Sequence, residues 1–149
     1  MIMRTHLAIA IGLILYFLPH VSYRLVFVPV LLFASLIPDI DSAFSFFGRK
    51  GISKPVQFFV KHRGLIHSFT ACFLFSLILV FVYPISAFAF FLGYGVHLFA
   101  DSFTVEGIRP FWPLKLNSKG MVRTGSRIED VVLVIVIIFD VLLFVRLFM

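Results

Sequence analysis

Seven side chains that can bind metal ions occur in short motifs along this sequence. They are His6, Asp39, Asp41, His62, His67, His97 and Asp101. His97 and Asp101 are four residues apart, so on a helix their Cβ atoms would lie about 6 Å apart on one face. Asp39 and Asp41 repel each other unless a cation or protons bind between them. Mixed imidazole and carboxylate sets suit zinc or manganese, and this number of ligands allows one or two divalent ions.

Four of these side chains are also candidates for catalysis: Asp39, Asp41, His67 and Asp101. An aspartate or histidine that does not bind the metal could accept or donate a proton during hydrolysis. Taken singly, each residue has a plainer interpretation, because a polar residue at the end of an apolar segment is often a solvated cap or a contact with lipid head groups. The grouping of all seven at the ends of apolar segments is what favours a metal site.

Five cations close to these motifs are candidates for binding a phosphate beside the metal. They are Lys61, Arg63, Arg109, Arg123 and Arg127. Guanidinium groups match phosphate oxygens in bidentate pairs. The alternative is that these residues only set the membrane topology and contact anionic lipids. Thr104 and Glu106, which follow Asp101, could support the metal ligands through hydrogen bonds.

The composition indicates an integral membrane protein. Of the 149 residues, 61% are hydrophobic and 13% are charged. A soluble domain carries about 25% charged residues, so an ordinary cytosolic globule is excluded, as are a disordered chain and a disulfide scaffold. The formal charge of +6 is expected to serve membrane topology and contact with membrane lipids, and no nucleic-acid partner is expected. Residues 1–149 are predicted to form a single integral membrane domain.

Five apolar segments are the candidate spans, at about Thr5–Leu18, Leu25–Ile37, Leu65–Tyr83, Ile85–Ala100 and Ile128–Phe148. A helix needs about 20 residues to cross the hydrocarbon core, a length that the third and fifth segments reach and the first two do not. Pro38 is expected to stop the second segment, and Pro84 to separate the third and fourth by a tight turn. The prediction is an all-α polytopic membrane bundle of about four to five transmembrane helices, the first two short.

The distribution of basic residues predicts the sidedness. The loops Asp39–Gly64 and Ser102–Arg127 carry five Lys or Arg residues each. Positively charged loops stay in the cytoplasm, so five crossings place the N-terminus and both loops on that side. All seven metal-binding candidates then fall at cytoplasmic helix ends, whereas His20 falls on the opposite side. We therefore expect a multi-pass protein of the inner membrane with its site at the cytoplasmic face.

Two carboxylates belong to the last apolar segment. Ser126 and Glu129 fit a capping box at its start, and Glu129 could also join the metal cluster. Asp140 lies in the middle of the segment, where an ionisable residue is a functional candidate. Our preferred interpretation of Asp140 is a protonated side chain that forms an interhelical hydrogen bond.

The motifs in combination resemble the YdjM-like family of bacterial and archaeal inner-membrane proteins. The matching elements are Thr5-His6, Pro38-Asp39-Ile40-Asp41-Ser42, His62-Arg63-Gly64 with His67-Ser68, and His97-Leu98 with Asp101-Ser102-Phe103-Thr104, Gly107-Ile108 and Trp112-Pro113. They extend from position 5 to position 113, and the C-terminal segment has no matching motif. The resemblance implies a membrane-bound metal-dependent hydrolase whose metal-site candidates are the same seven residues. It implies no substrate, and LexA regulation belongs to some members only.

Three functional hypotheses follow. The first is a metal-dependent hydrolase at the cytoplasmic membrane face, acting on a phosphoester or a lipid-linked phosphate. The second is a non-enzymatic membrane protein whose metal site is structural or regulatory. The third, an ion or proton pathway through Asp140, ranks last because the polar residues gather at one end of the predicted bundle.

Overall fold

The computed structural model describes residues 1–47 and 63–149, apart from the side chains at positions 40–47, 63, 64 and 148. Within these residues the chain is all-helical, with two isolated β-bridges in the connection 103–126. The helices are α1 (Met3–Phe17), α2 (Arg24–Phe47), α4 (Arg63–Ile66), α5 (Phe69–Val82), α6 (Pro84–Ser102) and α7 (Arg127–Phe148). The all-α class is confirmed.

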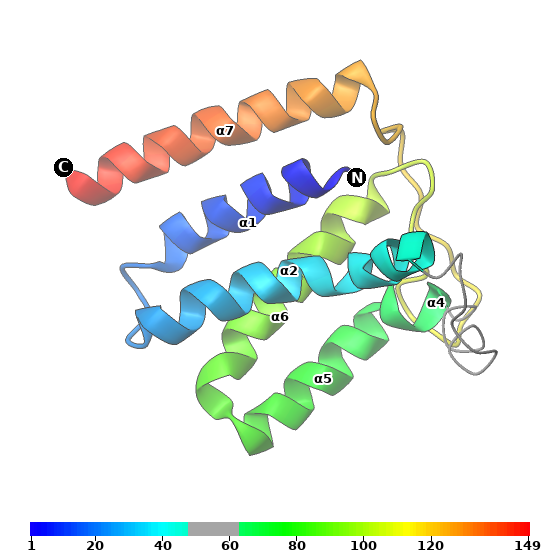
Figure 1. Cartoon of the computed structure of the whole chain (residues 1–149), viewed down its shortest axis with the longest axis horizontal. Coiled ribbons are helices and arrows are strands. Elements are labelled where there is room, and N and C mark those ends of the chain that lie inside the picture. Colours follow the sequence, from blue (N-terminus) through cyan, green and yellow to red (C-terminus); the bar gives the residue numbers. More distant parts are fainter. Residues whose placement is uncertain (48–62) are drawn as a thin grey trace.

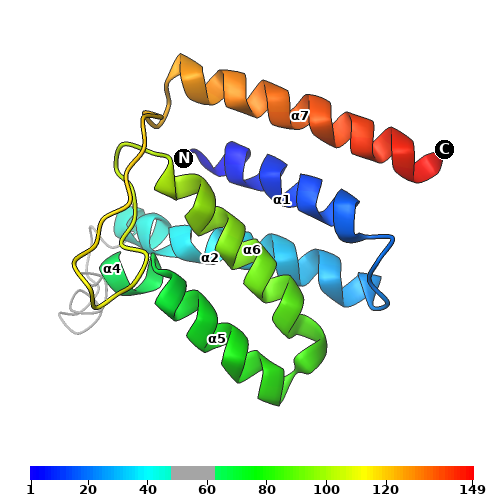
Figure 2. The same ribbon diagram turned by 180° about the vertical axis from the view of Figure 1, so that it is seen from behind.

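The helices lie side by side in the order α7, α1, then the pair α2 and α6, then α5 (Figures 1 and 2). The α2–α6 pair has the most extensive contact among the described helices, and α7 packs mainly on α1. One end of the array carries the N-terminus, the end of α6, the connection 103–126 and the start of α7 (Figure 1). The elements that carry the predicted site are thus gathered at one end.

The interior of the array is built from small residues as well as large ones. Ala10, Ala34 and Ala89 are fully buried, beside larger side chains such as Leu31 and Tyr94. Small side chains let helix backbones approach closely, which is how helices pack when lipid removes the hydrophobic drive between them. The outer faces of α5 and α7 expose large apolar side chains, including Phe81 and Leu142. An apolar surface of this extent is unusual for a protein in water.

Among the described helices, α6 is long and apolar enough to cross a membrane, and α1 and α5 are apolar but shorter. The predicted third segment is wrong in one respect, because it is divided into α4 and α5. Ser68 lies between them in an extended conformation and caps α5, its hydroxyl accepting from the amide of Ala71. His67 therefore precedes the cap of α5 and does not lie in its first turn.

The expected stop at Pro38 is also wrong. Helix α2 continues through Pro29 and Pro38 to Phe47, so Asp39 and Asp41 lie in its last turns and do not flank a turn of the chain. Proline inside a helix removes one backbone hydrogen bond, here the one to the carbonyl of Ala34. Pro38 is fully buried, and its neighbours Ser35 and Asp39 face His97 of α6. We conclude that tertiary packing outweighs the local cost of the proline.

At Gly93 the backbones of α6 and α2 approach closely. A Cβ atom at Gly93 would lie 2.3 Å from the backbone oxygen of Leu31, whereas a Cβ atom at Gly95 would meet nothing within 4 Å. We expect Gly93→Ala to destabilise the purified protein by about 1–3 kcal/mol, as overpacking typically does. Gly95→Ala is the matched control and should leave the melting temperature unchanged or raise it, because alanine favours helix. Equal melting temperatures for the two variants would contradict this account of the helix pair.

Candidate metal centre

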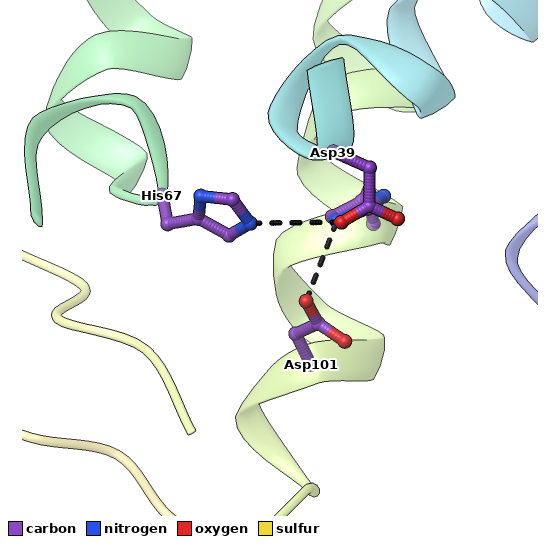
Figure 3. Close-up of side chains that lie close together, drawn as sticks. Asp39, His67 and Asp101 are labelled. Atoms are coloured by element: carbon purple, nitrogen blue, oxygen red, sulfur yellow. Dashed lines mark ion pairs between the residues drawn. The ribbon is translucent and has the colours of Figure 1, made fainter. Parts of the chain in front are cut away.

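Four of the predicted ligands come together at one end of the helices. Asp39 of α2, His67 before α5, and His97 and Asp101 of α6 each offer one ligand atom, and these four atoms all lie within 4.8 Å of one another. Figure 3 shows the imidazole of His67 and the carboxylates of Asp39 and Asp101 converging from three segments. Residues 62 positions apart in the sequence thus share one small volume, as a metal site requires.

The separations suit an ion between the donors better than direct hydrogen bonds. His97 Nε2 lies 3.4 Å from Asp101 Oδ2 and 3.7 Å from Asp39 Oδ1, and His67 Nε2 lies 3.9 Å from Asp39 Oδ1. Hydrogen bonds of this kind are normally 2.7–3.2 Å long. The ligand atoms of a tetrahedral zinc ion lie roughly 3.3–3.6 Å from one another. A small contraction of the four donors would therefore produce a metal-binding geometry.

The orientation of His97 supports this interpretation. Its Nδ1 lies 2.7 Å from the carbonyl oxygen of Ser35, so Nδ1 carries the proton and donates it to that carbonyl. The lone pair of Nε2 then faces the two carboxylates. His97 is fully buried, and Nε2 has no hydrogen-bond partner among the described residues. Histidines that bind a metal through one ring nitrogen usually donate the N–H of the other ring nitrogen to a group such as a backbone carbonyl.

His6 lies beside this group and not within it. Its ring stacks on that of His97 with centroids 3.8 Å apart, and its Nε2 lies 3.2 Å from Asp101 Oδ1. The two oxygens of Asp101 therefore face different histidines. His6 is buried, and neither ring nitrogen has a hydrogen-bond partner in the described part of the chain. The amino group of Met1 also contacts Asp101 Oδ1.

The other predicted site residues are either exposed or belong to positions whose side chains lie outside the described part of the chain. His62 and Lys61 lie outside the described residues, and Asp41 and Arg63 are placed only as helical backbone, in α2 and α4. Arg109, Arg123 and Arg127 are exposed, on the connection 103–126 and at the first residue of α7. Their role in holding a phosphate remains a prediction.

Three residues position the ligands through hydrogen bonds. The hydroxyl of Thr104 donates to the carbonyl of Asp101 at 2.7 Å, in line with the support expected from Thr104. Glu106 is exposed and accepts from Thr124 instead. Two further supporting residues were not predicted. The carbonyl of Ser35 orients His97, and the hydroxyl of Tyr94 donates to the carbonyl of Ile66 at 2.6 Å, next to His67. A backbone carbonyl leaves no signal in a sequence. Tyr94, however, lies three residues before His97 and therefore on the same side of a helix, which is a pattern that the sequence does contain.

Glu129 is buried but performs another task. Its carboxylate accepts from the backbone amides of Ile2 and Gly125 and from the hydroxyl of Thr5. Its own amide bonds the Ser126 side chain, which caps α7 as expected. Glu129 therefore connects the start of α1 to the start of α7 and restrains Ile2 and Thr5, which precede His6 in the chain.

Asp140 lies about three turns further along α7. It is mostly buried, and a Cβ atom added to Gly12 of α1 would lie 2.5 Å from its Oδ1. This oxygen has no hydrogen-bond partner among the described residues. The expected interhelical hydrogen bond is therefore not formed through Oδ1, and Asp140 packs against the small residue on α1 instead.

Metal binding should depend on the four donors. We expect His97→Ala and Asp101→Asn to lower the affinity for Zn²⁺ or Mn²⁺ by at least the ~10–100-fold that changes around metal ligands commonly cause. Bound metal would be measured by mass spectrometry on detergent-purified protein. His20→Ala is the matched control, because His20 is exposed and bonds only Tyr16 of its own turn. Unchanged metal content in both cluster variants would rule out this site.

Glu129→Ala should reduce stability and leave metal binding intact. It removes the acceptor of three donors, at about 1–3 kcal/mol for each donor left without a partner. Asp130→Ala is the control, since its ion pair with Arg4 is exposed and such pairs contribute about 0–1 kcal/mol. Thermal melts and metal content of the folded protein would be compared. Loss of metal without loss of stability would instead make Glu129 part of the metal site.

The comparisons with known proteins agree with the motif resemblance. Residues 1–148 match the family described as YdjM inner membrane protein. The chain is 35% identical over 99 residues to the inner membrane protein YdjM of Escherichia coli K12 and to that of Shigella flexneri, covering 59% of this chain and 50% of each relative. It is 36% identical over 128 residues to the uncharacterized protein YvsG of Bacillus subtilis 168, covering 75% of this chain and 77% of that protein.

The aligned part thus spans about half the length of the YdjM proteins. No solved structure shows significant similarity to the chain. Because the family match covers nearly every residue and the two YdjM relatives are named inner membrane proteins, a membrane location is supported. This chain, with its cluster of histidines and aspartates at one end of an all-helical array, belongs to the YdjM inner membrane protein family.

Proposed function

We propose that this protein is a membrane-bound, metal-dependent hydrolase that acts on a phosphoester at the end of the helices where Asp39, His67, His97 and Asp101 meet. The observation that carries the proposal is the environment of His97 Nε2. This nitrogen is buried between two carboxylates and has no hydrogen-bond partner among the described residues. An orphaned ring nitrogen beside two anionic oxygens is the donor arrangement that a divalent cation satisfies.

The four donors would hold one divalent ion, zinc or manganese. When bound, such an ion supplies Lewis acidity that activates water and polarises the scissile bond. The hydrogen bonds from His97 to Ser35 and from Thr104 to the carbonyl of Asp101 keep two of the ligands oriented. Asp39 and His67 have the more open side chains, 31% and 14% exposed. A substrate would therefore approach from their side.

His6 has two possible tasks in this mechanism. It lies 3.2 Å from the Asp101 oxygen that does not face His97, so it could exchange a proton with a reacting group. Alternatively, His6 and this oxygen could hold a second ion, which would supply additional Lewis acidity. Metal stoichiometry distinguishes the two, since a His6→Ala variant would keep one ion per chain in the first case and lose one of two in the second.

The substrate class is proposed from charge and location. Arg109, Arg123 and Arg127 are exposed cations that could bind a phosphate, and the family is one of inner membrane proteins. A lipid-linked phosphate would reach the site from within the leaflet. With this function we propose a multi-pass arrangement in which several helices cross the membrane and the N-terminus is cytoplasmic. The exposed apolar faces of α5 and α7 and the basic connection 103–126 support that arrangement.

A structural metal site is the second candidate. Four protein donors can fill every position around a tetrahedral ion, and closed sites of this kind generally stabilise a fold and do not react. This alternative predicts that added metal raises the melting temperature without any turnover.

The hydrolase proposal can be tested with conservative variants in detergent-purified, metal-loaded protein. Phosphate release would be measured on a panel of phosphomonoesters, phosphodiesters and phospholipids. Asp39→Asn and His67→Ala should reduce activity by at least about 100-fold, the scale of general acid–base and metal contributions. His20→Ala should keep full activity. Variants of Asp39 or His67 that retain full activity would refute the proposed site, and metal-dependent stabilisation without turnover would favour the structural alternative.

A further inference from the structure

The connection 103–126 between α6 and α7, here called the platform, has a defined shape. Bridges join Thr104 to Val122 and Ile108 to Ser118, so the platform folds back on itself. The amide of Val105 donates to the carbonyl of Val122 at 3.0 Å, and the amide of Gly120 to that of Thr104 at 2.9 Å. These bonds hold two runs of the platform against each other.

Two glycines permit this close approach. Gly107 has φ +64°, and a Cβ atom there would lie 2.1 Å from the carbonyl oxygen of Ser118. A Cβ atom at Gly120 would lie 2.1 Å from the carbonyl oxygen of Phe103. Larger residues at these two positions would force the two runs apart, so the conformation of the platform depends on both glycines.

The platform is attached to the end of the array that carries the metal-binding cluster. It begins directly after α6, and Thr104 bonds the carbonyl of Asp101. The amide of Phe69, at the start of α5, donates to the carbonyl of Pro110 at 2.8 Å. Figure 2 shows the yellow and orange trace of this segment running past the end of α6 toward α7. If α6 crosses the membrane, the platform begins at the water–lipid boundary.

The surface of the platform combines positive charge with large apolar side chains. Its exposed cations are Arg109, Lys115, Lys119 and Arg123, and its one acidic residue is Glu106, which already accepts from Thr124. Its exposed apolar side chains include Phe111 (51%), Leu114 (58%), Leu116 (57%) and Met121 (91%). Cations interleaved with exposed apolar side chains are typical of a surface that lies in the head-group region of an anionic membrane.

We propose that the platform docks on the anionic leaflet next to the metal-binding cluster. Leu114, Leu116 and Met121 enter the head-group and upper acyl region, and the four cations pair with lipid phosphates. A bilayer fits better than nucleic acid, because exposed leucine and methionine side chains gain nothing from a sugar–phosphate backbone. Docking would restrain the ends of α5 and α6, which position His67 and Asp101. The proposal does not depend on hydrolase activity.

The chain contains its own probe for this surface. Trp112 is the single tryptophan of the sequence, and it lies within the platform. The full-length protein would be placed in nanodiscs of phosphatidylcholine alone or mixed with phosphatidylglycerol. Quenching of Trp112 by brominated acyl chains and by aqueous iodide would be compared. We expect stronger quenching by bromolipid and weaker quenching by iodide in the anionic bilayer.

Variants separate charge from apolar insertion. Lys115→Glu and Lys119→Glu should each reduce the ratio of docked to undocked protein by at least about fivefold, because each change removes one cation from the anionic surface and adds a negative charge. Leu116→Ser with Met121→Ser should reduce bromolipid quenching in both bilayers. Arg24→Glu is the matched control, because Arg24 is exposed at the start of α2, away from the platform, and this change should have no effect. Melts in detergent would confirm that each variant folds.

The wild-type protein alone can overturn the proposal. Equal iodide quenching in neutral and anionic nanodiscs, without bromolipid quenching, would show that the platform does not contact lipid. A change in Trp112 emission on adding inorganic phosphate in detergent, with no lipid dependence, would indicate an anion site and refute membrane docking. A shift caused by an oligonucleotide and not by lipid would make the platform a nucleic-acid surface.

Discussion

His97 is completely buried, and its Nε2 lies between the carboxylates of Asp39 and Asp101. Two carboxylates at this separation repel each other, and the repulsion grows as the surroundings become less polar. Positive charge or protons must therefore offset this repulsion, and the amino group of Met1, which contacts Asp101 Oδ1, supplies part of that charge beside any bound ion. The relative placement of α1, α2, α6 and the residue pair before α5 decides how these charges meet, because His6, Asp39, His97 with Asp101, and His67 lie on these four segments.

The packing of the array explains how donors from distant segments reach one volume. Gly93 and Ala34 let α6 and α2 approach closely, which brings His97 within hydrogen-bonding distance of the Ser35 carbonyl. Glu129 fixes the start of α1 against α7 through three hydrogen bonds and so places His6 against His97. The position of His6 beside the cluster consequently depends on the contact between α1 and α7, and the metal-binding cluster itself is sensitive to the packing of α2 on α6. It is also sensitive to the platform, which bonds both to Asp101 and to the residue after Ser68.

Much of this organisation could be predicted from residue types. The apolar segments predicted an all-α protein, and the polar residues at their ends predicted that seven histidines and aspartates would gather at one end. Five of them, His6, Asp39, His67, His97 and Asp101, lie together there, and the side chains of Asp41 and His62 are outside the described part. The boundaries were less predictable. Pro38 is normally a stop signal, yet here burial against α6 keeps the helix intact around it. Ser68 interrupts an apolar run that by hydropathy alone continues from Leu65 to Tyr83, because its hydroxyl caps α5.

The sequence by itself determined which chemical groups are available and that they lie at the ends of apolar helices. Residue type sets hydropathy and donor chemistry, and both can be read without coordinates. Only the tertiary structure decided which groups meet. In the structure the carboxylate of Glu129 accepts hydrogen bonds from backbone amides and a hydroxyl and is therefore not available to a metal ion. The Nε2 of His97, by contrast, has no hydrogen-bond partner among the described residues. That distinction depends on distances between segments far apart in the chain, and such distances are set by helix packing and not by local sequence.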